Sequence, residues 1–104
     1  VTFSHRIRTE QSLEEKNQAS NTSLYYMPYM TANGILEGFN AYNEVIRRVA
    51  REKYVYLIDN NNSIPGDGVH FNDSVHFTDQ GSQQMANRIF EALSGTQKFK
   101  PFIQ

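Results

Sequence analysis

The sequence contains no cysteine, which excludes a disulfide framework and metal sites built on thiolates. This absence is compatible with either a secreted or a cytoplasmic protein. No apolar run approaches the roughly 20 residues that a membrane-spanning helix needs. The 10 basic residues nearly balance the 11 acidic ones, and the formal net charge is −1 at pH 7. Because there is neither a basic excess nor a basic run, the charge pattern does not indicate a nucleic-acid-binding protein.

Apolar spacing predicts an α/β chain. Residues 35–51 and 79–93 carry apolar side chains at intervals of three and four, which is typical of amphipathic helices. Ser12 followed by Glu15 fits a capping box and predicts a short helix over residues 13–19. The run Tyr54–Ile58 is continuously apolar, as in a strand buried in a parallel sheet. Residues 1–3 are similarly interpreted as the end of a strand, so two strands are expected.

Two of the three histidines lie in one loop, and each follows an aspartate by three residues. These pairs are Asp67-x-x-His70 and Asp73-x-x-His76. If the segment turns, the carboxylate accepts a hydrogen bond from one ring nitrogen and leaves the other nitrogen free as a base. An orienting acid and a histidine base are two members of a nucleophile–base–acid triad.

The second pair has the stronger helical context. Thr78 is a predicted N-cap immediately after His76, and Gly81 in the first helical turn permits close approach of a neighbouring backbone. We therefore assign Asp73 as the orienting acid and His76 as the general base. His70 and Asp67 are interpreted as loop residues near the site.

The second pair also carries a family resemblance. The pattern Asp73-Ser-Val-His76-Phe-Thr-x-x-Gly81, with the apolar helix after it, resembles the C-terminal block of the SGNH (GDSL-type) hydrolases. Weaker similarity extends back to Phe39, so the resemblance covers roughly residues 39–93. It implies a three-layer αβα, flavodoxin-like fold and a carboxylic-ester hydrolase with a Ser-His-Asp triad. It requires no cofactor, and the substrates of such enzymes are small-molecule, carbohydrate or lipid esters.

The nucleophile of that family is not found in this sequence. The family carries its serine in a Gly-Asp-Ser block and oxyanion-hole residues in further blocks, one of them Gly-x-Asn-Asp. The nearest match is Gly66-Asp67-Gly68, which lacks the serine. We therefore expect residues 1–104 to be the C-terminal portion of one hydrolase domain, with about two strands and two or three helices. By itself this portion is expected to have little or no hydrolase activity.

Two other functions fit the same loop. In a small non-catalytic α/β interaction module, Asp73 and His76 would only brace the loop. In a metal-binding protein, three or four of Asp67, His70, Asp73 and His76 would converge on zinc or a similar ion. The helix that begins directly after His76 disfavours a loop that folds around a metal ion.

Three further features have less specific interpretations. His5 is expected in a solvated polar loop rather than at a site. The aromatic cluster Leu24–Met30, interrupted by Pro28, is expected to be non-helical and to cover the core rather than to form a substrate-pocket wall. Asp59 ends the second predicted strand, at the edge where α/β proteins place their sites.

Overall fold

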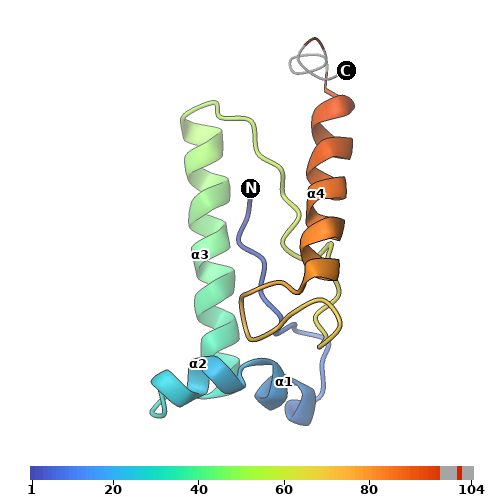
Figure 1. Ribbon diagram of the computed structural model, residues 1–104. Helices are drawn as coiled ribbons and strands as arrows, with labels where there is room; N and C mark the ends of the chain where they lie inside the picture. The colour runs from blue at the N-terminus through green and yellow to red at the C-terminus, as the bar shows by residue number, and fades with distance from the viewer. Residues whose placement is uncertain (97–100, 102–104) are drawn as a thin grey trace.

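The computed structural model describes residues 1–96 and 101, and in these residues the chain forms four α-helices (Figure 1). The helices are α1 (Leu13–Ala19), α2 (Asn21–Tyr26), α3 (Ala32–Glu52) and α4 (Asp79–Ser94). Figure 1 shows the N-terminal segment running between α3 and α4, with α1 and α2 gathered at one end of α3.

Side-chain caps begin three of these helices, and the two that the sequence predicts, at Ser12 and Thr78, are confirmed. The Ser12 hydroxyl accepts from Glu15 N–H while the Glu15 carboxylate accepts from Ser12 N–H, each at 3.1 Å. Thr31 caps α3 and Thr78 caps α4, each accepting from the N–H group three residues on. Because Thr31 already caps it, α3 begins three residues before the predicted start.

The expected three-layer αβα fold is wrong for the part of the chain that the structure describes. It contains no sheet, and its only β-bridge is an isolated antiparallel one between Phe71 and Phe77. The predicted strand Tyr54–Ile58 begins in a turn and forms no β-ladder. Tyr54 is 92% exposed and has a φ of 55°, and Val55 is 60% exposed. This apolar run is therefore not the buried strand that its composition predicts.

Backbone hydrogen bonding explains why the two extended segments do not form a sheet. Thr2 N–H donates to Ile58 O at 3.1 Å, but the bonds of the next residue go elsewhere. Asn43 of α3, fully buried, accepts from Phe3 N–H at 2.7 Å and donates to Phe3 O at 2.9 Å. One side-chain amide thus takes both backbone groups that a neighbouring strand would have paired.

The core is small and lies where the N-terminal segment meets α1 and α3. Its buried members are Ile7, Ala19, Ala32 and Leu36, with Phe39 packed against them. The radius of gyration is 15.3 Å, whereas a compact domain of this length has about 13 Å. The chain is therefore more open than a compact domain, and much apolar surface of α3 and α4 stays accessible.

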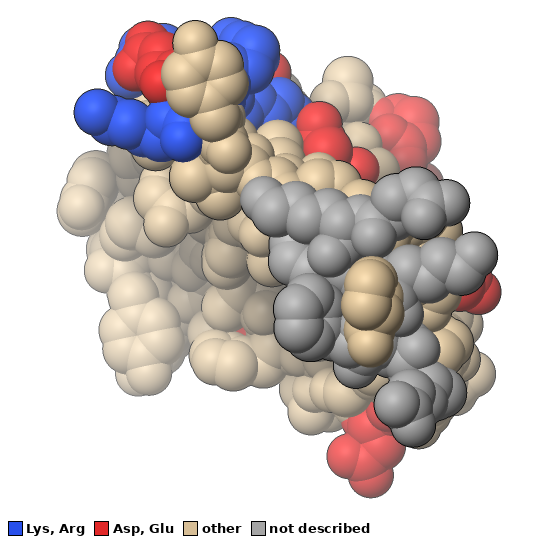
Figure 2. All heavy atoms as spheres, turned by 90° about the horizontal axis from the view of Figure 1, so that it is seen from above, with Lys and Arg blue, Asp and Glu red and all other residues tan. Residues whose placement is uncertain are grey.

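The charged face of α3 is solvated, as its spacing predicts. Figure 2 shows basic side chains gathered at one end of the molecule, next to a broad uncharged surface. The Arg48–Glu52 pair of α3 spans 3.9 Å, with each side chain 61% exposed, so it contributes little stability. No helix among the described residues is long and apolar enough to cross a membrane.

Candidate active site

The segment Asp73–His76 forms a tight turn held by one carboxylate, and we call it the exposed turn. Asp73 Oδ1 accepts from the backbone N–H groups of Val75 (2.9 Å) and His76 (2.8 Å). Asp73 Oδ2 lies 2.9 Å from His76 Nδ1. The structure thus brings the two residues assigned from the sequence into direct contact.

This arrangement determines which nitrogen of His76 carries the proton. Partial burial raises the pKa of Asp73, but hydrogen bonds from Val75 N–H, His76 N–H and the His76 ring outweigh that effect, and the pKa lies below its ordinary value. The group is therefore a carboxylate at neutral pH and can only accept hydrogen bonds. His76 Nδ1 must then donate, which leaves the lone pair of Nε2 available as a base.

The Nε2 atom of His76 is open to incoming molecules. The His76 side chain is 76% exposed, against 29% for Asp73. Within residues 1–96 and 101, Nε2 has no hydrogen-bond partner, serine included. Ser74, although adjacent in sequence, is buried, and its hydroxyl faces Ser23 N–H. The site therefore holds an oriented base without a nucleophile beside it.

The segment Asp67–His70 repeats the same hydrogen bonds around a buried histidine, and we call it the buried turn after His70. Asp67 Oδ1 accepts from Val69 N–H and His70 N–H, each at 3.0 Å, and lies 2.7 Å from His70 Nδ1. The His70 side chain is only 10% exposed. Its Nε2 lies 2.9 Å from the side-chain amide nitrogen of Gln84 on α4. Both ring nitrogens therefore have hydrogen-bond partners, and His70 has no lone pair available to act as a base.

Gln84 is a hydrogen-bond partner of His70 that the sequence pattern did not predict. It lies three residues after Gly81, so both face the same side of α4. Gly81 is buried, and a Cβ there would collide with the carbonyl oxygen of His70. The expectation that Gly81 permits a close backbone approach is thus confirmed, and the helix face that it shares with Gln84 was the available signal.

The four acidic and imidazole side chains of the loop do not form a metal-binding group. Among the described residues, no three His, Asp or Glu side chains are placed to hold a metal ion together. Asp67 is engaged with His70 and Asp73 with His76, so the carboxylates are divided between the two turns. Three converging ligands, which a zinc site needs from the protein, are therefore not assembled.

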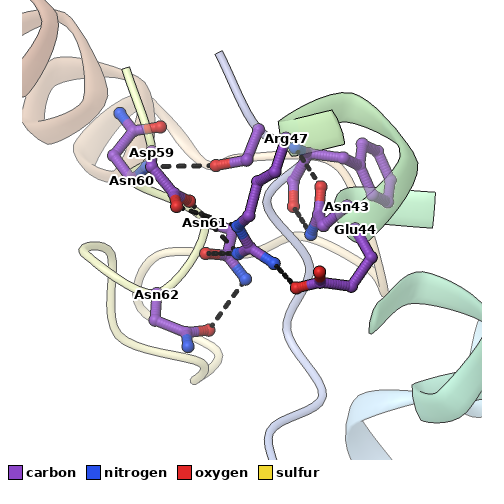
Figure 3. A network of polar contacts seen from close by, with 9 residues as sticks. Asn43, Glu44, Arg47, Asp59, Asn60, Asn61 and Asn62 are labelled. Carbon is purple, nitrogen blue, oxygen red and sulfur yellow. Dashed lines mark hydrogen bonds and ion pairs between the residues drawn. The ribbon is translucent and has the colours of Figure 1, made fainter. Parts of the chain in front are cut away.

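Asp59 serves as an anchor for α3. Figure 3 shows Arg47 reaching from α3 to the carboxylate of Asp59, with Glu44 on its other side. The Arg47–Asp59 distances are 2.8 and 3.1 Å. The hydrogen bond from Arg47 holds the pKa of Asp59 below its ordinary value. This carboxylate is thus committed to a structural ion pair.

His5 is buried, and the expectation of a solvated loop is wrong. Its ring is 1% exposed, stacks on Phe39 at 4.8 Å and bonds through Nδ1 to Ile7 O at 2.7 Å. Burial lowers the pKa of His5, because the charged ring would lose its hydration. The ring belongs to the packing beside the core.

The aromatic cluster 24–30 does not cover the core as expected. Tyr25, Tyr26 and Tyr29 are each at least 74% exposed. The expectation that the cluster is non-helical is wrong for residues 24–26, which form the end of α2. Leu24 and the two methionines are half-buried, and Met27 and Met30 line an apolar hollow of about 440 Å³ against α3.

A second hollow, of about 360 Å³, opens between α3 and α4 beside the exposed turn. Val75 and Phe77, the residues on either side of His76, line it together with Phe3 and Tyr42, which also line the first hollow. The surroundings of the exposed turn are therefore apolar. Comparison of the chain with protein-family models, curated proteins and solved structures finds no match.

Proposed function

We propose that this chain supplies the acid and base of a carboxylic-ester hydrolase. The observation that carries the proposal is the exposed turn: an ionised Asp73 holds His76 by Nδ1 and leaves Nε2 open to solvent. The resemblance of this block to SGNH hydrolases supports the same assignment. The apolar hollow beside Val75 and Phe77 suits the acyl or alcohol part of a small-molecule, carbohydrate or lipid ester.

In this proposal His76 acts first as a base and then as an acid. A serine hydroxyl from a Gly-Asp-Ser block, which this sequence does not contain, attacks the acyl carbon while His76 Nε2 takes its proton. The resulting imidazolium is stabilised by the Asp73 carboxylate and gives the proton to the departing alcohol. Water then attacks the acyl-enzyme by the same route, releasing the acid and regenerating the serine.

The test compares two lengths of chain in one assay. Hydrolysis of a simple aryl ester is measured for residues 1–104 and for the product of the whole reading frame that encodes them. We expect little or no activity from the first and clear activity from the second. In the longer product, His76→Ala should reduce kcat by at least about 100-fold, since that is the usual contribution of a general base.

Two results would contradict the proposal. One is an active longer product whose rate does not change in His76→Ala and Asp73→Asn. The other is a reading frame without a serine nucleophile and without esterase activity, which would favour the interaction-module function, with the exposed turn as a brace.

A further inference from the structure

Two backbone hydrogen bonds, at His76 and at Thr78, join the two turns. Asn72 N–H donates to His76 O at 2.8 Å, and Thr78 N–H donates to His70 O at 3.0 Å. These bonds form the Phe71–Phe77 bridge, whose two rings lie 5.0 Å apart. The backbone that carries His76 is therefore paired with the backbone that carries His70.

The buried turn is also fixed to α4. Gln84 reaches from the helix to His70 Nε2, and the absence of a side chain at Gly81 lets the first turn of α4 press on the His70 carbonyl. Asp67 holds the opposite ring nitrogen of His70. The His70 ring thus joins the loop to the helix through both of its nitrogens.

The exposed turn is anchored at Ser74, two residues before His76, rather than at the His76 ring: Arg6 N–H donates to Ser74 O at 2.9 Å and Ser23 N–H donates to Ser74 Oγ at 3.4 Å. Beyond Asp73, no side chain in the described part of the protein forms a hydrogen bond with the His76 ring. Asp73 therefore orients the ring, and on the C-terminal side of the turn the backbone is held by the pairing of His76 with Asn72 and of Thr78 with His70.

We propose that His70 and Gln84 are positioning residues for His76. By holding the buried turn against α4 they fix the backbone from which the His76 ring projects, and so keep Nδ1 directed at Asp73. Their value for catalysis rests on the proposed function, but their effect on the His76 ring does not, and it can be measured in the chain of 104 residues.

The experiment reads the tautomer of each histidine by ¹⁵N NMR. Spectra are recorded at increasing pH until the ring ¹⁵N signals no longer change, so that the neutral tautomers are compared. Wild type should show Nδ1–H at both His70 and His76. Gln84→Ala, which removes a side chain that does not touch His76, should raise the Nε2–H to Nδ1–H ratio of His76 by about fivefold, the change expected from losing one hydrogen bond.

The chain offers a matched control next to the tested residue. Gln83 is exposed and bonds only to Asn87 on its own helix, so Gln83→Ala should leave both histidines unchanged. If Gln84→Ala fails to fold, Asn72→Ala provides the second variant. Asn72 is exposed, and its side chain donates to Phe77 O at 3.2 Å, so its loss loosens the joint without opening the core.

The outcomes separate this inference from the proposed function. A wild-type His76 that is mainly Nε2–H would overturn the Asp73–His76 pairing, and with it both proposals. A wild-type Nδ1–H ring that stays unchanged in Gln84→Ala and Asn72→Ala would overturn the positioning role alone. A shift of His76 in Gln84→Ala but not in Gln83→Ala would support it.

Discussion

The buried and the exposed turn share a sequence pattern and the same local hydrogen bonds, yet only one of them presents a histidine nitrogen that can act as a base. Both read Asp-x-Val-His-Phe, and in both the aspartate accepts two backbone N–H groups and the ring Nδ1. His70 is 10% exposed and bonded at both nitrogens, whereas His76 is 76% exposed with Nε2 open. Local sequence therefore specifies the turn, and packing against α4 decides whether its histidine braces the loop or is free to act as a base.

Glycine at position 81 is where the helix and the buried turn meet, and its substitution should have the largest effect. A Cβ at Gly81 would collide with the backbone at His70, which cannot move aside as a flexible side chain can. We expect Gly81→Ala to cost about 2–3 kcal/mol of unfolding free energy, measured by urea unfolding.

Gly38 provides the control for this prediction. It lies within α3 with nothing within 4 Å of an added Cβ, so Gly38→Ala should gain about 0.5–1 kcal/mol. A similar result for both glycines would show that α4 does not press on the buried turn.

Removing each histidine in turn compares the two settings directly. His70→Ala should cost about 2–3 kcal/mol, because it removes a buried ring with two partly buried hydrogen bonds and leaves Gln84 without its partner. His76→Ala should cost less than about 1 kcal/mol, because its pair with Asp73 is mostly solvated. Chemical unfolding of both variants measures the difference, and equal costs would mean that the two turns contribute alike to stability.

The N-cap of α4 separates a stability effect from an effect on the site. Thr78→Ala should cost about 1 kcal/mol, and so should Thr31→Ala at the equivalent cap of α3. Only the Thr78 variant should also shift the NMR signals of His76, because the Thr78 hydroxyl, besides capping α4, donates to Val69 O in the buried turn. Equal shifts from both variants would indicate a general loosening of the fold.

The pH dependence of unfolding in acid should show the smallest effect, which comes from the substituted carboxylates of the two turns. The folded pKa values of Asp67 and Asp73 lie below the ordinary 3.8. Their stabilising contribution is therefore present above that value and is lost as the pH falls through the lowered pKa values. Asp67→Asn and Asp73→Asn should each make unfolding less sensitive to pH between about pH 4.5 and 2. An unchanged acid dependence in one variant would show that its turn does not hold an ionised carboxylate.

The helices were largely predictable because their signals are local. The capping box of Ser12 and Glu15, the caps at Thr31 and Thr78, and the apolar repeats all act within a few residues. Local hydrogen bonds also made the Asp73–His76 contact predictable.

The missed features depend on distant partners. Tyr54–Ile58 has the composition of a buried strand, but a strand also needs a neighbour, and Asn43 takes the bonds that Phe3 could have offered. His5 is buried by Phe39, 34 positions away in the sequence. Gln84 contacts His70 across 14 residues, and only the face that it shares with Gly81 indicates the contact.

Chemical modification of the histidines tests the central contrast most directly. Diethylpyrocarbonate acylates accessible neutral imidazole nitrogens, and tandem mass spectrometry of the peptide that contains both turns resolves the two sites. We predict that His76 reacts at least about tenfold faster than His70, since the latter is buried and bonded at both nitrogens. Equal rates, or faster modification of His70, would contradict the account, because His76 would then not be the residue with the open basic nitrogen.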